Sequence, residues 1–219
     1  TYFVSGPQVD LNETDVTALR NAGHEIGTHG GEHVTWISTL RKHKAAWKKE
    51  HKGQDAGEWS EAEAIAELYE SEVKAPKETL ERILGYPITL YRPPGGLGWK
   101  NATTSLAVQE HILGKQLNIV HWTIDSGDSV PTDDQDAIAA VFPDGVVPKG
   151  TKKPKRMRTE EEILAEMLKA KDGDVILLHC FGGKGGRMPT VRALDQALTE
   201  LEKDFDFVTI SELYGLPGP

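Results

Sequence analysis

Two histidines directly follow a short apolar segment in the stretch Gly23-His24-Glu25-Ile26-Gly27-Thr28-His29-Gly30-Gly31-Glu32-His33. His29 and His33 lie four residues apart, so both imidazoles can coordinate one ion from the same side of a turn or helix. Neutral imidazole is the commonest protein ligand for zinc and similar ions. The stretch therefore predicts a strand that ends in a metal-binding pair.

The composition is that of an ordinary globular chain. At 219 residues the chain can bury a single core, so we expect one domain over residues 1–219. Its net charge of -9 argues against nucleic acid or an anionic membrane surface as a partner, and allows a neutral or cationic polymer. A single cysteine, Cys180, excludes an internal disulfide and a multi-cysteine zinc site. The sequence has no apolar run of about eighteen residues, so no membrane span is expected.

Short apolar runs alternate with longer helical segments along the chain. Strands are expected over Thr1–Ser5, His24–Gly27, Ile88–Tyr91, Leu117–Ile124, Val175–His179 and Phe207–Ile210. Helices are expected over Asn12–Ala22, Leu40–His51, Ser60–Leu84, Thr103–Leu113, Asp134–Val141, Thr159–Lys169, Pro189–Lys203 and Ser211–Tyr214. This alternation predicts an α/β fold with parallel strands, of which a barrel is one form. The proline- and lysine-rich segment Pro143–Arg158 predicts an inserted loop.

Polar side chains capable of chemistry follow four of the expected strands. In parallel α/β folds, functional groups gather at the carboxyl ends of the strands. A core would prefer apolar residues at these positions, so packing alone does not explain them. The residues concerned are the pair His29 and His33, then Arg92, then Asp125 with Asp128, and finally His179.

Four ordered motifs that contain these residues resemble those of the polysaccharide deacetylases. These are the NodB-like enzymes of carbohydrate esterase family four, and the resemblance spans almost the whole chain. Each motif is weak alone, but four in the same order are specific. The motifs are Gly23–His33, Tyr91-Arg92-Pro93-Pro94-Gly95-Gly96, Trp122-Thr123-Ile124-Asp125-Ser126-Gly127-Asp128 and Leu177-Leu178-His179.

The resemblance implies a distorted (β/α) barrel that hydrolyses N-acetyl or O-acetyl groups on glycans such as chitin or peptidoglycan. It implies a divalent metal ion, most often zinc, held by an Asp and two His. A second Asp would activate the metal-bound water and a His would act as the acid. It also suggests an extracellular or cell-envelope location.

Carried onto this sequence, the resemblance makes His29 and His33 metal ligands and His179 the acid. Arg92 would orient the base carboxylate. Asp128 would tune His179, with Asp125 as the second candidate for this role. The Gly95 N–H would lie at the oxyanion position, and Leu177 would line the acetyl-methyl pocket. Trp36 and Trp99, which lie near the motifs, are candidates for stacking on sugar rings.

The chain departs from the family pattern at its start. The family's first motif, a strand that ends in an Asp pair, is expected before Thr1, so we expect a barrel without its first strand. That motif would supply the third metal ligand and the base. Gly95 and Ser129 stand where the family usually has aromatic residues, which affects substrate preference more than reaction class.

Two alternatives to a glycan deacetylase therefore stay open. A catalytically degenerate barrel that binds glycan is favoured by the missing Asp pair. A hydrolase of small amides or imides with the same fold is favoured by Gly95 and Ser129.

Overall fold

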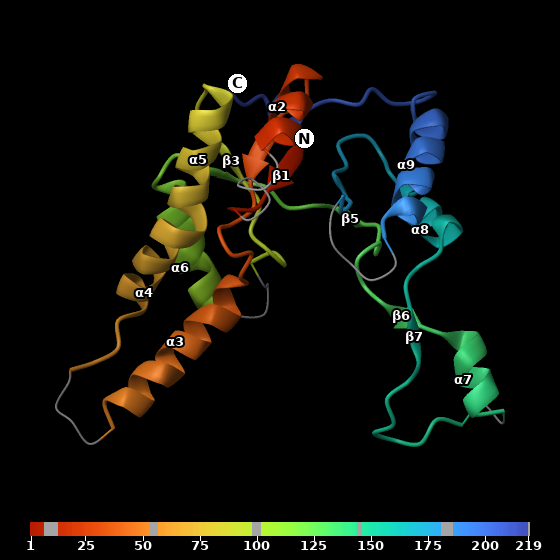
Figure 1. Cartoon of the computed structure of the whole chain (residues 1–219), viewed down its shortest axis with the longest axis horizontal. Coiled ribbons are helices and arrows are strands. Elements are labelled where there is room, and N and C mark those ends of the chain that lie inside the picture. The colour runs from red at the N-terminus through yellow and green to blue at the C-terminus, as the bar shows by residue number, and fades with distance from the viewer. Residues whose placement is uncertain (7–12, 53–56, 98–101, 144–145, 181–185, 219) are drawn as a thin grey trace. The chain divides into compact units, whose positions relative to one another are not determined.

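The computed structural model describes residues 1–6, 13–52, 57–97, 102–143, 146–180 and 186–218. The chain forms two compact units (Figure 1). The first unit contains Thr1–His121 and Val208–Pro219, and the second contains Trp122–Phe207.

A four-stranded parallel sheet organises the first unit, with strand order β1-β2-β3-β4. The strands are short: β1 (Tyr2–Val4), β2 (Ile26–Thr28), β3 (Leu90–Tyr91) and β4 (Asn118–Ile119). Val4 pairs with Thr28, Thr28 with Tyr91, and Tyr91 with Ile119, so one row crosses all four strands at their carboxyl ends. The residues that follow this row are therefore placed along one edge of the sheet.

The helices of the first unit supply most of its apolar core. They are α2 (Glu13–Asn21), α3 (Trp36–Glu50), α4 (Glu61–Tyr69), η1 (Glu70–Lys74), α5 (Ala75–Leu84), α6 (Ala102–Leu113) and α10 (Ile210–Tyr214). Two clusters of buried side chains form this core, one around Trp36, Val73 and Val108 and the other around Ile26 and Leu80.

One helical rod corresponds to the expected helix Ser60–Leu84 (Figure 1). Its start is confirmed, because the Ser60 side chain accepts the Glu63 N–H as an N-cap. The rod contains a π-helical turn, η1, between α4 and α5, and Pro76 lies directly after this turn. The sequence did not predict this change of helix type, which is common at functional sites.

The second unit is built on a two-stranded parallel sheet of β5 (Ile124–Asp125) and β8 (Ile176–Leu177). A separate antiparallel pair joins β6 (Thr132–Asp133) to β7 (Lys155–Arg156). Three helices, α7 (Gln135–Val141), α8 (Glu160–Met167) and α9 (Met188–Leu201), complete the unit. α8 begins with a capping box, in which Thr159 and Glu162 exchange hydrogen bonds.

The parallel α/β organisation is confirmed, and three local expectations are corrected. Leu117–Ile124 is not one strand but contributes to β4 and β5, which belong to different units. Pro143–Arg158 is not only a loop, because β7 lies within it. Phe207–Ile210 is not a strand: Thr209 forms a capping box with Glu212, so helix α10 already begins at Ile210. The single domain and the barrel without its first strand stay predictions.

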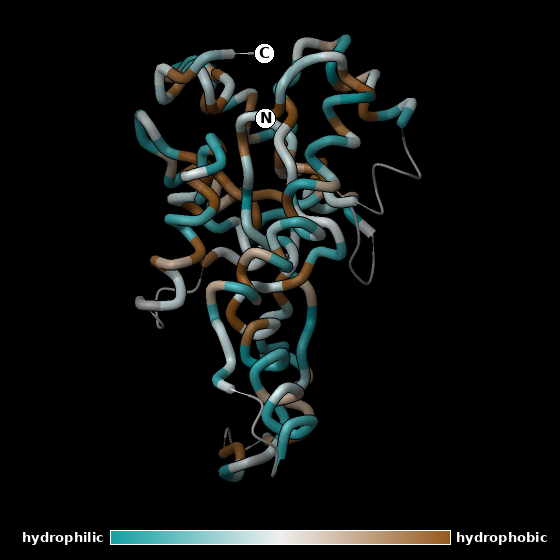
Figure 2. The backbone as a smooth tube through the Cα atoms, turned by 90° about the vertical axis from the view of Figure 1, so that its left-hand side faces the viewer, coloured by the Kyte–Doolittle hydropathy of each residue, from teal (hydrophilic) through white to brown (hydrophobic). Residues whose placement is uncertain are grey.

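Hydrophobic and hydrophilic residues are interspersed along the chain (Figure 2). Among the described residues, no helix is long and apolar enough to cross a membrane.

The second core cluster should carry a large share of the stability of the first unit. Leu80 on α5 is fully buried, so Leu80→Ala should lower the free energy of unfolding by about 2–5 kcal/mol. Chemical denaturation measures this change. Leu106→Ala on α6 is the matched control, because Leu106 is 55% exposed and should change the value little. Equal losses for both variants would contradict the assigned core.

Candidate functional site

His29 and His33, from the Gly23–His33 motif, lie just beyond the carboxyl end of β2. The His29 backbone N–H donates to Val4 O at 2.8 Å, which extends the pairing of β1 and β2 by one residue. His33 follows after a tight loop and has a left-handed backbone with φ of 57°. This conformation is uncommon for a residue with a Cβ and requires support from its surroundings.

The rings of His29 and His33 face each other through their Nε2 atoms. His29 Nδ1 lies 2.6 Å from Arg92 O, and a carbonyl oxygen can only accept, so His29 Nδ1 carries the proton. Its Nε2 therefore keeps a lone pair. This nitrogen lies 3.1 Å from Nε2 of His33, with the two ring planes 76° apart.

This arrangement fits two ligands of one metal ion. Nitrogens that each lie about 2.0–2.1 Å from zinc are about 2.9 Å apart at a right angle and about 3.4 Å apart at the tetrahedral angle. The observed separation of 3.1 Å falls between these limits. The bond from His29 Nδ1 to a backbone carbonyl is also the usual way in which proteins orient a metal-binding imidazole. The described residues contain no group of three or more His, Cys, Asp or Glu side chains placed to hold an ion.

Arg92 follows β3 and lies beside the histidine pair through its backbone. Its guanidinium lies 4.2 Å from the centre of the Phe3 ring and donates to Val120 O and His121 O. Burial lowers the pKa of this guanidinium to about 10, so Arg92 remains charged at neutral pH. A cation is thus fixed at the edge of the sheet, where it can attract a carboxylate or an anion.

The turn after Arg92 exposes its backbone. Gly96 N–H donates to Pro93 O at 3.0 Å, and Gly95 at the tip of the turn is exposed. An exposed backbone N–H at this position can donate to an oxygen of a bound ligand.

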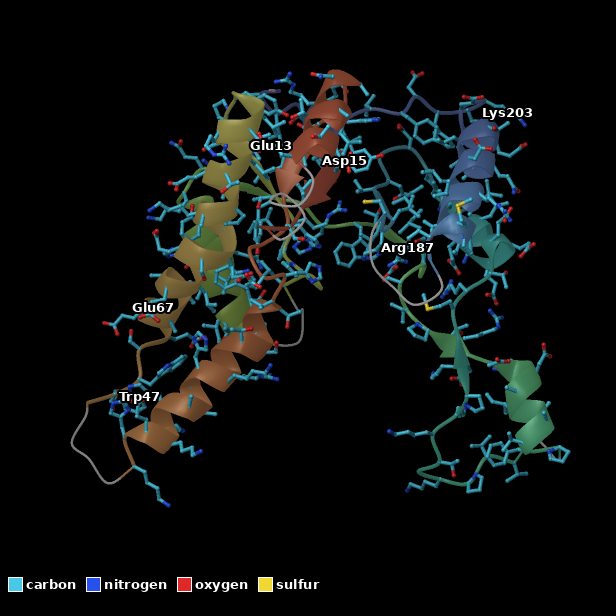
Figure 3. The ribbon with its side chains drawn as sticks, in the orientation of Figure 1. Glu13, Asp15, Trp47, Glu67, Arg187 and Lys203 are labelled. Carbon is cyan, nitrogen blue, oxygen red and sulfur yellow. The ribbon has the colours of Figure 1, made fainter. Side chains whose placement is uncertain are left out.

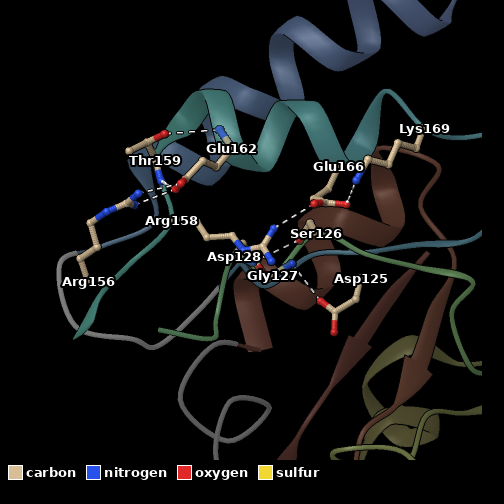
Figure 4. A network of polar contacts seen from close by, with 10 residues as sticks. All are labelled: Asp125, Ser126, Gly127, Asp128, Arg156, Arg158, Thr159, Glu162, Glu166 and Lys169. Atoms are coloured by element: carbon tan, nitrogen blue, oxygen red, sulfur yellow. Dashed lines mark hydrogen bonds and ion pairs between the residues drawn. The ribbon is translucent and has the colours of Figure 1, made fainter. Parts of the chain in front are cut away.

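In the second unit, a tight turn leads from Asp125, the last residue of β5, to Asp128 (Figure 4). Asp125 Oδ1 accepts the Gly127 N–H at 2.9 Å, so the carboxylate of Asp125 closes the turn and the residue stays exposed. Gly127 has φ of 68°, and a Cβ there would collide with the guanidinium of Arg158. The left-handed conformation favours glycine, and Glu166 holds the guanidinium of Arg158 over this position.

Asp128 is buried at the end of this turn and contacts His179. Its Oδ1 accepts from His179 Nδ1 at 2.7 Å, and its Oδ2 accepts from the His179 backbone N–H at 2.9 Å and from Thr190 Oγ1 at 3.2 Å. Arg187, at the start of α9 (Figure 3), donates to Asp128 O and lies 3.7 Å from Oδ2. Because Nδ1 donates, the His179 side chain, which is 31% exposed, presents Nε2 as its other proton-carrying position.

These contacts determine the charge of Asp128. Burial opposes the ionised form, but the hydrogen bonds from His179 and the nearby Arg187 outweigh it and lower the pKa of the Asp128 carboxyl. Asp128 is 3% exposed, so this carboxylate is a buried negative charge that is hydrogen-bonded to Nδ1 of His179.

Comparison with known proteins identifies the family. The sequence profile described as "Polysaccharide deacetylase" matches residues 1–112, just over half of the chain. The chain belongs to the polysaccharide deacetylase family. The resemblance seen in the sequence motifs is thereby confirmed.

The chain is also similar to a curated protein and to several solved structures. The peptidoglycan-N-acetylglucosamine deacetylase of Bacillus cereus is 27% identical over 215 residues, covering 97% of this chain and 74% of the relative. A family 4 acetyl xylan esterase from Clostridium thermocellum, solved with a cobalt ion, has a TM-score of 0.60 and 19% identity over 98% of this chain and 80% of its own. A CE4 family pseudoenzyme from Bacillus anthracis has a TM-score of 0.57 and 17% identity. This match covers 96% of the present chain and 53% of the pseudoenzyme.

The structure tests only one of the two tryptophans that were expected to stack on sugars. Trp36 is 2% exposed and donates from Nε1 to the Tyr91 hydroxyl at 2.7 Å inside the core. A sugar cannot reach this ring, so that expectation is wrong. Trp99 lies outside the described residues. Leu177 is buried in β8, paired with Asp125, and its role in a methyl pocket stays a prediction.

Several residues that support the candidate site were not found from the sequence. Thr190 and Arg187 contact Asp128 from α9, and no spacing in the sequence relates them to that residue. Glu72 contacts the loop that carries His33, and the sequence pattern could have indicated this residue. It falls on the same helical stripe as Ile65 and Leu68, where an acidic residue needs a buried partner.

Ionised Asp128 should stabilise the fold in a pH-dependent way. Its folded-state pKa is lowered below about 3.9, the value for unfolded Asp, so the stabilisation is complete above that pH and lost as pH falls through the folded-state pKa. Asp128→Asn should therefore lower the unfolding temperature near pH 7, and the difference from wild type should shrink towards pH 2. Thermal unfolding across this range tests it, with exposed Asp195→Asn on α9 as control. A difference that stays constant with pH would contradict the assignment.

Proposed function

We propose that this chain is a metal-dependent hydrolase that removes acetyl groups from an N-acetylated or O-acetylated glycan. The observation that carries the proposal is the pair of ring nitrogens, 3.1 Å apart, on a chain of the polysaccharide deacetylase family. Peptidoglycan is the first candidate substrate, because the curated relative is named as a peptidoglycan-N-acetylglucosamine deacetylase. Chitin is the second. The cell envelope or the extracellular space is the corresponding location.

His29 and His33 would hold the ion, and zinc suits two neutral imidazoles. A bound divalent ion lowers the pKa of its water and polarises the carbonyl of the acetyl group. The two rings already face each other, since the bond from His29 Nδ1 to Arg92 O orients the first of them. Among the described residues, no third potential ligand lies with His29 and His33.

The other assigned residues handle the proton and the developing charges. Asp128 holds the Nδ1 proton of His179, so the opposite nitrogen, Nε2, can deliver a proton to the leaving amine. Gly95 would offer its backbone N–H to the carbonyl oxygen as negative charge builds there. Arg92 would orient the base carboxylate, and Leu177 would line the site of the acetyl methyl group.

Two alternatives have specific support. A catalytically degenerate barrel that binds glycan is favoured because the described residues contain no third side chain beside His29 and His33 that could hold the ion. A hydrolase of small amides or imides is favoured by the exposed glycine at position 95, which opens one side of the site.

Acetate release from N-acetylated peptidoglycan and chitin oligomers tests the proposal. His33→Ala should abolish release by removing a metal ligand. His179→Ala should lower kcat by about 100- to 10,000-fold by removing the acid. His43→Ala is the matched control, because His43 is an exposed histidine on α3 outside the motifs.

The outcomes separate the three functions. Release that survives His33→Ala or His179→Ala would contradict the deacetylase proposal. Saturable binding of the oligomers without turnover by the wild-type protein would favour the degenerate barrel. Turnover of small amides alone would favour the third function.

A further inference from the structure

The loop that carries His33 is attached to a buried carboxylate on a different element. Glu72, in the π-helical turn η1, is 4% exposed. Its two carboxylate oxygens accept the Glu32 N–H at 3.1 Å, and Oε2 also lies 3.5 Å from the Val34 N–H. The hydrogen bonds that this carboxylate makes with described residues all go to backbone amides of the loop. Glu32 and Val34 flank His33 on both sides, so the carboxylate fixes the chain directly before and after this histidine.

The backbone of Glu72 makes a further contact with the same loop. Glu72 O accepts the Gly31 N–H at 3.0 Å. In a regular helix this carbonyl would accept from the residue four positions later, which is Pro76 and has no N–H. The proline therefore leaves the carbonyl available for Gly31. The approach is so close that a Cβ at position 31 would collide with Ser71 O, which only glycine avoids.

The loop needs this support because His33 has an unfavourable backbone conformation. A left-handed φ of 57° is unfavourable for a residue with a side chain, and it persists only where the surroundings over-determine it. Glu72 accepts the hydrogen bonds of Gly31, Glu32 and Val34 N–H, from residues before and after His33, while Gly6 N–H holds the start of the loop at Gly30 O. Without them the backbone at His33 could relax, and its ring would turn away from His29.

We propose that Glu72 is the positioning residue that holds His33 in the orientation required to share a metal ion with His29. The carboxylate receives amide protons from residues on both sides of His33, as in the backbone nests that bind anions. The inference deepens the proposed function and rests on its metal site, but the anchoring of the loop can be measured without any metal.

The test compares Glu72→Gln with Glu70→Gln in the same π-helical turn. Both remove one negative charge, but Glu70 is exposed and pairs only with Lys74 among the described side chains. In Glu72→Gln, one of the two acceptor oxygens becomes an NH2 donor that opposes the loop N–H groups, and the negative charge that strengthens the remaining hydrogen bonds is lost. Two readouts apply: cobalt(II) affinity followed by visible absorption, and hydrogen exchange of the Glu32 and Val34 amides in the metal-free protein.

Glu72→Gln should weaken cobalt binding by about 10- to 100-fold and accelerate exchange of both amides, while Glu70→Gln leaves both unchanged. If Glu72→Gln does not fold, Glu72→Asp keeps the charge on a shorter side chain and should show the same changes. Wild-type affinity together with wild-type amide exchange in the folded variant would overturn the inference. If the wild-type protein and His33→Ala both fail to bind cobalt, the proposed metal site fails, and the exchange of Glu32 and Val34 alone decides whether Glu72 anchors the loop.

Discussion

A row of backbone hydrogen bonds at the carboxyl end of the four-stranded sheet determines where the candidate metal-binding residues lie. His29 N–H donates to Val4 O, Arg92 N–H to Thr28 O, and Val120 N–H to Tyr91 O. Each bond lies at or just beyond the end of a strand, so His29 and Arg92 are neighbours despite the 62 residues between them in the chain. The contact between His29 Nδ1 and Arg92 O follows directly from this register. A slip of one residue in β2 or β3 would turn one of these side chains to the opposite face.

Both units stabilise a buried carboxylate by surrounding it with donors. Glu72 accepts hydrogen bonds from backbone amides of the loop that carries His33. Asp128 accepts hydrogen bonds from an imidazole, a backbone amide and a hydroxyl. An isolated carboxylate would be costly to bury, so each carboxylate also fixes the positions of its donors. The consequence differs in the two units, because Glu72 acts on a backbone while Asp128 acts on the side chain of His179.

The sequence pattern predicted which polar residues follow the strands. Placing His29, Arg92, Asp128 and His179 after strands required only the alternation of apolar runs and the rule that parallel strands end at one edge. The same reasoning failed where tertiary contacts override local pattern. Trp36 lies close to the motif in sequence but starts a helix whose first turn enters the core. Phe207 and Val208 have strand-like composition, yet the capping box at Thr209 begins a helix and leaves both side chains about half exposed.

The burial of Asp128 bears on the choice between a deacetylase and a barrel that only binds glycan. Replacing a whole buried charge network by well-packed apolar residues is often neutral for stability or increases it. Instead, the carboxylate holds the proton of a partly exposed imidazole on Nδ1 and leaves the opposite nitrogen for proton transfer. Binding a neutral sugar requires no such control of a proton, whereas expelling an amine leaving group does. The arrangement of Asp128 and His179 therefore favours catalysis, and it does so independently of the histidine pair in the first unit.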